Sequence, residues 1–163
     1  MAATAEDAAV EVLLAVDVGS SSVRCCPFAV SRSSQTSFPL GSVGVARERV
    51  VFGPMGTASA PDVTKAAARV VLECVERLRK VLPSFEVKAL GFACFSMSLV
   101  GVDSSGNPVT PVFTYADRHP GTLTALATLK ELSEAAGSQA RIEARTGAPL
   151  HSSYAAPQLA RLR

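Results

Sequence analysis

A lone aspartate and a run of small polar residues separate two apolar stretches near the start of the chain. Residues 12–18 are apolar apart from Asp17, residues 19–22 read Gly-Ser-Ser-Ser, and residues 25–30 are apolar again. Two apolar runs joined by a short glycine and serine turn predict a β-hairpin of buried strands, with the strands over 11–18 and 23–30. The rest of the chain has to be arranged around this hairpin.

The turn of this hairpin has the chemistry of an anion site. A turn without bulky side chains exposes backbone N–H groups, and hydroxyl groups add further donors, so it could cradle a phosphate. Asp17, at the end of the first strand, could hold Mg²⁺ through water. The same residues also fit an ordinary hairpin turn, and this stretch alone leaves both interpretations open. It is not a P-loop, because it lacks the Gly-x4-Gly-Lys pattern and leads into a strand.

Composition narrows the class of protein. The chain has 163 residues, enough for one domain with a sizeable core. It is 48% apolar and only 18% charged, against a usual charged share of about 25%. Either most of the chain is buried, or one apolar face is covered by a partner. The net charge of +2, with scattered basic residues, gives no case for nucleic-acid binding.

Cysteine usage and the chain ends bear on the cellular compartment. Cys25, Cys26, Cys74 and Cys94 form no C-x-x-C pair and lie in apolar runs, so we expect buried reduced thiols in a reducing, cytoplasmic compartment. Residues 1–10 lack the pattern of a signal peptide and are predicted to be a disordered lead. No stretch approaches the roughly 20 apolar residues of a membrane span, so no membrane association is expected.

The order of expected elements is three strands, a helix, further strands and then helices. This order predicts an α/β fold with helices packed on a mixed sheet. After the hairpin we expect a strand over 44–52, a loop over 53–60 and a helix from a capping box at Ser59–Asp62 to a stop at Pro83. A central strand covered on both faces is expected over 87–95, and two further strands over 99–102 and 109–115 around a turn at 103–108. Helices over 122–136 and 139–145 and the start of a helix at 154 complete the chain.

Four segments together resemble the FGGY carbohydrate kinases, a family of the actin-like ATPase superfamily. Residues 17–24 resemble the first phosphate loop of that family, and residues 91–103 its substrate-side strand pair. Residues 106–118 are similar to the segment that ends in Trp-x-Asp. Residues 145–159 are similar to the Thr-Gly-x-Pro-x-His and Ala-Pro-Lys-Leu segments. The pattern looks most like gluconate and xylulose kinases, because of Met97-Ser98-Leu99 and Thr114-Tyr115-Ala116-Asp117.

The resemblance implies a fold and a reaction. The fold is an actin-like ATPase (ribonuclease H-like) domain, a mixed sheet with an N-terminal β-hairpin or meander and flanking helices. Residues 11–163 would be a truncated, incomplete N-terminal domain whose second domain is absent. The reaction is transfer of the γ-phosphoryl group of ATP, with Mg²⁺, to a hydroxyl of a sugar or sugar acid.

The resemblance also assigns residues by position. Those expected at the nucleotide are Asp17, near Mg²⁺, together with Gly19, Ser20, Ser21, Ser22 and Arg24. Those expected to line the sugar side are Ser96, Met97, Asp117 and Arg118. Simpler interpretations remain for some of them. Met97 could be a core residue, Asp117 could cap the following helix, and His119 and His151 fit polar loop residues better than a catalytic base.

The chain also departs from the family pattern. Ser96-Met97 stands where Met-His is common, Tyr115 where tryptophan is usual and His119 where arginine is usual. In the family the catalytic aspartate lies further along, so the base is expected beyond Arg163. We therefore expect the chain alone to be inactive or nearly so, with its apolar faces covered by the missing domain or in a homodimer. The alternative is a non-catalytic module of this fold that binds a sugar or a partner.

Overall fold

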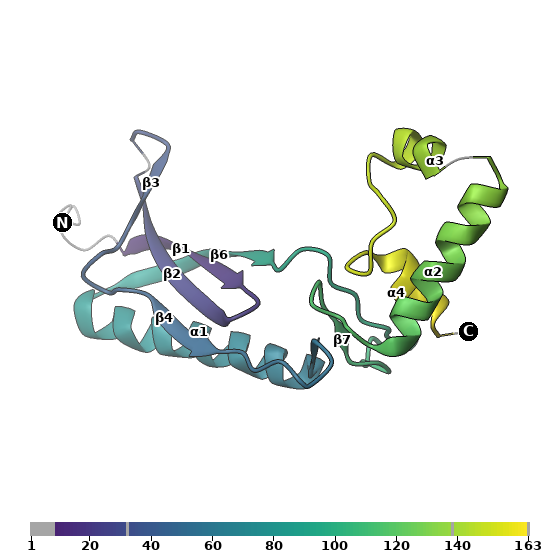
Figure 1. The fold of residues 1–163 in the computed structure, drawn as a ribbon. Helices are drawn as coiled ribbons and strands as arrows, with labels where there is room; N and C mark the ends of the chain where they lie inside the picture. Colours follow the sequence, from purple (N-terminus) through teal and green to yellow (C-terminus); the bar gives the residue numbers. More distant parts are fainter. Residues whose placement is uncertain (1–8, 32, 138, 163) are drawn as a thin grey trace, which may run out of the picture. The chain divides into compact units, whose positions relative to one another are not determined.

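A computed structural model describes residues 9–31, 33–137 and 139–162 (Figure 1). Most of the lead predicted over residues 1–10 therefore lies outside the described residues. The contacts divide the chain into two compact units, which we describe separately. Unit 1 comprises residues 1–50 and 62–95, and unit 2 comprises residues 51–61 and 96–163. The single domain over 11–163 that the sequence predicts stays a prediction.

The predicted hairpin is the centre of unit 1. Strands β1 and β2 pair antiparallel from Val12 opposite Ala29 to Val18 opposite Val23, which confirms the prediction. β3 and β4 both pair antiparallel with β2, and β6 pairs parallel with β1, so the sheet is mixed, as predicted, with the order β3-β2-β1-β6. The strand bounds are β1 Val10–Val18, β2 Ser22–Ser31, β3 Thr36–Pro39, β4 Ala46–Arg49 and β6 Phe85–Cys94.

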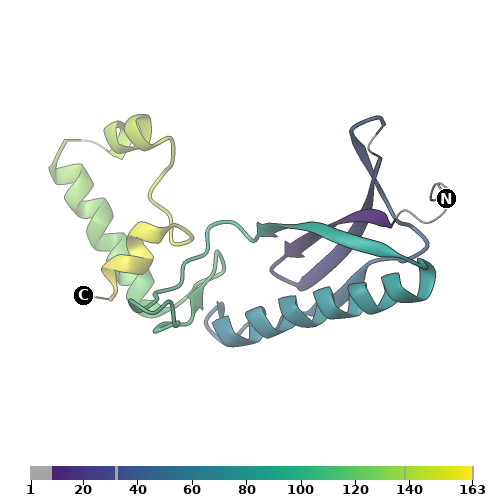
Figure 2. The ribbon, with the colours of Figure 1, turned by 180° about the vertical axis from the view of Figure 1, so that it is seen from behind.

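Helix α1, Ala60–Val81, covers one face of this sheet and confirms the predicted helix (Figure 2). It contributes a buried stripe of residues four positions apart, which is the spacing of one helix face. Every second residue of β1 is buried against that stripe, because strand side chains alternate between the two faces of a sheet. The core consists of Val12, Leu14, Val16, Val18, Val23, Cys25, Val43, Ala46, Ala66, Val70, Cys74 and Leu78.

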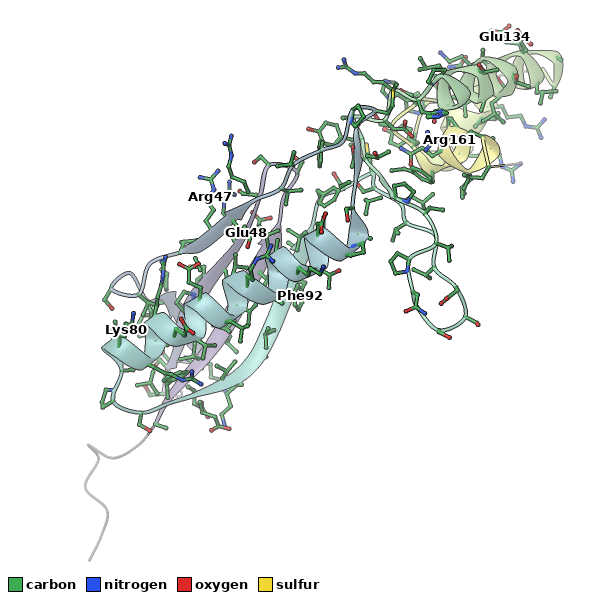
Figure 3. The ribbon with its side chains drawn as sticks, turned by 90° about the horizontal axis from the view of Figure 1, so that it is seen from below. Arg47, Glu48, Lys80, Phe92, Glu134 and Arg161 are labelled. Atoms are coloured by element: carbon green, nitrogen blue, oxygen red, sulfur yellow. The ribbon has the colours of Figure 1, made fainter. Side chains whose placement is uncertain are left out.

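The apolar strand predicted as central lies at the end of the sheet. β6 pairs with β1 on one side only, and within the described residues no strand pairs with its other edge. Leu90 is 46% exposed and Phe92, labelled in Figure 3, is 61% exposed. The prediction that both faces are covered was therefore wrong. An apolar run shows that a strand suits burial, but its neighbours decide whether it is buried.

Unit 2 has less sheet than the sequence predicted. Leu99 and Val102 make only isolated bridges, to Phe113 and Pro108, and the strand predicted over 109–115 shrinks to two residues. Proline has no N–H to donate to a ladder, and Pro108 flanks this segment. The predicted loop over 53–60 in turn contains a short strand. The elements of unit 2 are β5 Thr57–Ala58, β7 Val112–Phe113, α2 Pro120–Ala135, α3 Gln139–Thr146 and α4 Ala155–Ala160.

The cysteines divide into two groups, all four as free thiols. Cys25 and Cys74 are buried in the core of unit 1, as predicted, whereas Cys26 is half-buried and Cys94 is exposed. The prediction of burial fails for Cys94 because it lies at the end of the uncovered strand β6. A hydrogen bond with Cys74, together with burial, raises the pKa of the Cys25 thiol well above its usual range. No described helix combines the length and the apolar character that a membrane crossing needs.

Candidate functional site

The turn between β1 and β2 is tight at its base and open at its tip. The Gly19 N–H donates to the Ser22 carbonyl at 3.0 Å, and a Cβ on Gly19 would lie 3.0 Å from that same oxygen, so only glycine fits without a shift. Ser20 is half-buried and Ser21 is exposed. Among the described residues, the N–H groups of Ser20 and Ser21 donate to no other group. The tip therefore offers two amide donors and two accessible hydroxyl groups.

Ser22 differs from the other two serines of the turn. It begins β2, pairs with Arg49 of β4, and its side chain is fully buried. Its Oγ has no hydrogen-bond partner among the described residues. An unpaired buried hydroxyl is unfavourable by roughly 1–3 kcal/mol. The structure thus places Ser22 behind the open tip rather than on it.

Asp17 and Arg24 face each other across the base of the turn. They are cross-strand neighbours, and Arg24 Nη1 lies 3.0 Å from Asp17 Oδ2. Their side chains are 53% and 42% exposed, and such exposed pairs contribute about 0–1 kcal/mol. The Asp17 carboxylate is accessible to water and fits a hydrated Mg²⁺, which is held by few protein ligands. No group of three or more potential metal ligands occurs in the described part of the chain.

The predicted sugar-side residues at the start of unit 2 form an exposed loop. Ser96 is exposed, and Met97 is 46% exposed, so the alternative that Met97 is a core residue was wrong. Met97 also has a φ of 54°, in the left-handed region that side chains other than glycine rarely adopt. Strained backbone of this kind concentrates at binding and catalytic sites.

Asp117 is buried inside unit 2, and three groups donate hydrogen bonds to its carboxylate. The His119 N–H donates to Oδ1 at 2.9 Å, and the Thr122 hydroxyl donates to Oδ2 at 3.1 Å. Arg161 Nη1, at the end of α4, lies 3.0 Å from Oδ1 and 2.8 Å from Oδ2. The alternative in which Asp117 caps α2 was wrong, because the capping residue is His119, whose Nδ1 accepts from the Gly121 N–H.

The loop around Asp117 also carries residues that reach solvent. Tyr115 is 45% exposed and Arg118 is exposed, so these two side chains, and not Asp117, are available to a ligand. Sequence reasoning missed Arg161 and Thr122. Nothing local marks them, because Arg161 lies 44 residues after Asp117 and only the folding of α2 and α4 brings the three together.

A hollow of about 490 Å³ on unit 2 adjoins the groups that bond Asp117. Apolar residues such as Met55, Phe113 and Leu162 line it, together with His119 and Arg161. The predicted sugar-side residues do not line it. It is therefore not the site that the sequence predicts.

Comparison with known proteins gives structural likenesses only. No protein-family model matches the sequence, and no curated protein matches it. A gluconate kinase from Lactobacillus acidophilus matches 94% of this chain with a TM-score of 0.71 at 14% identity. A glycerol kinase from Plasmodium falciparum, solved with ADP, matches 93% with a TM-score of 0.73 at 13% identity. A xylulose kinase from Rhodospirillum rubrum matches 91% with a TM-score of 0.72 at 16% identity.

These likenesses define the class of fold. The chain has the actin-like ATPase fold of carbohydrate kinases, in agreement with the resemblance drawn from the sequence. Within that class the solved neighbours are gluconate, xylulose and glycerol kinases. The chain spans 28% of the length of each of the three kinases compared above, so the fold is incomplete.

Proposed function

We propose that this chain is the N-terminal part of an ATP-dependent carbohydrate kinase of the cytoplasm, which transfers the γ-phosphoryl group of ATP to a hydroxyl of a sugar or sugar acid. The observation that carries the proposal is the open tip at Ser20 and Ser21, at the end of the first hairpin of a fold shared with such kinases. Two unpaired amides and two hydroxyl groups, with no bulky side chain, suit the non-bridging oxygens of a phosphate.

In this proposal the residues of unit 1 hold the nucleotide phosphates. The tip donates hydrogen bonds, Arg24 supplies positive charge, and Asp17 receives Mg²⁺ through its water ligands. The metal would neutralise charge on the phosphate oxygens. Phosphoryl transfer asks the protein mainly for positioning and charge neutralisation, which these groups can supply. The catalytic base belongs to a segment beyond Arg163.

The residues of unit 2 would hold the sugar. Ser96 and Met97 lie on an exposed loop, and Arg118 is exposed on another. Tyr115 is exposed on the same loop as Arg118 and stands where the kinases that this chain resembles have tryptophan, so we add it to this set. Asp117 keeps its predicted place on the sugar side, but its burial makes it a supporting group.

Nucleotide binding can be tested on the chain as it stands. Titration of the isotope-labelled chain with ATP and Mg²⁺ should shift the amide resonances of Gly19, Ser20 and Ser21 in a saturable way. Ser21→Asp, which places a like charge on the tip, should weaken binding at least tenfold. Ser33→Asp is the matched control, because it puts the same charge on the exposed serine-rich turn after β2. The proposal would be contradicted if Ser33→Asp weakened ATP binding and Ser21→Asp did not.

Sugar binding separates the kinase part from the alternative module. D-Gluconate, D-xylulose and glycerol should each be titrated, with and without ATP, and the resonances of Ser96, Met97 and Tyr115 followed. Saturable binding of both nucleotide and sugar supports the kinase part. Sugar binding with no response of the β1–β2 turn to ATP supports the non-catalytic module.

A further inference from the structure

One buried cation holds the loop that carries two of the predicted sugar-side residues. We propose that Arg161 is a positioning residue, which fixes the loop Thr114–His119 so that Tyr115 and Arg118 are presented to the sugar. Asp117 is then the acceptor for Arg161 and does not touch the sugar. The part of this inference that concerns the sugar rests on the proposed function. The fixing of the loop does not.

The first step is that the carboxylate of Asp117 is already occupied. A carboxylate accepts about four hydrogen bonds, and the His119 N–H, the Thr122 hydroxyl and Arg161 Nη1 make four contacts with it between 2.8 and 3.1 Å. The Asp117 side chain has no exposed surface. A sugar hydroxyl would have to displace one of these donors to reach it.

The second step is that Arg161 is itself held in place. Its side chain is only 8% exposed, and Nη1 also lies 2.7 Å from the Thr122 hydroxyl oxygen. Its guanidinium carbon lies 4.1 Å from the centre of the Phe113 ring, which adds a cation–π contact. A flat guanidinium can stack on the ring and bind the carboxylate together, whereas a lysine ammonium cannot reproduce both contacts. Figure 3 labels Arg161 at the end of α4.

The third step is that the same C-terminal segment supports the loop at two further points. Gln158 Nε2 donates to the Thr114 carbonyl at 3.0 Å, and the Ser153 hydroxyl donates to the Tyr115 carbonyl at 2.7 Å. Residues 153–161 therefore bind the backbone of the loop at two residues and, through Arg161, the side chain of a third, Asp117. The side chains of Tyr115 and Arg118 are exposed by the loop that is held in this way.

Amide hydrogen exchange in the full chain tests the fixing of the loop without any ligand. We expect Arg161→Lys and Arg161→Met to speed exchange of the Asp117, Arg118 and His119 amides at least tenfold, with the amides of α1 unchanged. Arg145→Met, on an exposed face of α3, is the matched control and should change none of them. Loop exchange within threefold of wild type in both Arg161 variants overturns the inference. If Arg161→Met abolishes slow exchange throughout α2, unit 2 has unfolded in that variant, and the result for Arg161→Lys alone decides the inference.

Binding then tests the role toward the sugar. The probe is whichever of D-gluconate, D-xylulose and glycerol binds best to the wild-type chain. Arg161→Lys should raise the dissociation constant for this probe at least tenfold. The dissociation constant for ATP with Mg²⁺ should stay unchanged. The positioning role is overturned if Arg161→Lys raises the dissociation constants for the sugar and for ATP equally, or raises neither. If the wild-type chain binds no sugar, the sugar half of the proposed function fails and the presentation of Tyr115 and Arg118 fails with it, whereas the exchange result still decides whether Arg161 holds the loop.

Discussion

Units 1 and 2 of this chain are stabilised in different ways. Of the sixteen buried apolar core residues found in the described part of the chain, thirteen lie in unit 1 and three in unit 2. The buried polar side chains show the reverse. Of the seven buried polar side chains among the described residues, only Ser22 lies in unit 1. The other six lie in unit 2: Thr114, Asp117, Thr122, Ser133, Ser153 and Gln158.

The contrast separates two physical means of fixing a chain. Apolar burial is non-directional and roughly proportional to area, so unit 1 depends on the pattern and volume of its core residues. Hydrogen bonds and buried ion pairs are directional, so unit 2 depends on particular partners at particular distances. We therefore expect unit 1 to respond to lost volume and unit 2 to lost partners.

The largest effect should follow from Asp117→Ala. It leaves Arg161 buried without its counter-charge, and breaking one side of a buried pair destabilises by about 3–5 kcal/mol. The loss of stability is measured by denaturant unfolding, with amide exchange in α2 as the probe. Asp103→Ala, in an exposed turn, is the control. Equal losses in the two variants would show that the Asp117 pair is not what stabilises unit 2.

The next largest effect should follow from Leu78→Ala in unit 1. Leu78 is fully buried between α1 and the sheet, and buried leucine to alanine changes destabilise by about 2–5 kcal/mol. Leu72→Ala on the same helix, where the side chain is 64% exposed, should change the free energy of unfolding by no more than about 0.5 kcal/mol. Similar losses for both variants would contradict the packing of α1.

Hydroxyl removal should have opposite signs in the two units. Ser22→Ala removes an unpaired buried hydroxyl, so unit 1 should be stabilised by about 1 kcal/mol. Thr122→Val removes a hydroxyl that bonds both Asp117 and Arg161, so unit 2 should be destabilised by about 1–2 kcal/mol. Thermal unfolding of both variants gives the signs. A loss of stability in Ser22→Ala would mean that its hydroxyl has a partner.

The smallest effect should be a dependence on acid pH in unit 1. The hydrogen bond from Arg69 of α1 lowers the pKa of Glu48 on β4 below its usual value. A lowered folded-state pKa contributes stability above the unfolded-state pKa, and that stability is lost as the pH falls through the folded-state value. Stability should therefore fall slightly below about pH 4.5. Glu48→Gln should remove this part of the acid dependence, and an unchanged pH profile in that variant would exclude the pair as its source.

Much of unit 1 could be predicted from the sequence. The hairpin, α1 and the mixed sheet follow from alternation within strands, a four-residue stripe and an apolar run, which are local signals. Unit 2 was predicted less well. Its helices were found within a few residues, but its strands were overestimated because prolines and glycines break the ladders. The assignments of Asp17 and of the serines to the nucleotide stay predictions.

The amino-acid sequence alone determined the first hairpin, the helices and the turn that could offer donors to a phosphate, because backbone preference and apolar spacing act over a few positions. Only the tertiary structure decided that Ser22 is buried while Ser21 is open, that β6 lies uncovered at the edge of its sheet, and that Arg161 binds Asp117. Burial and pairing depend on groups distant in the chain, and their positions are set only when the chain has folded.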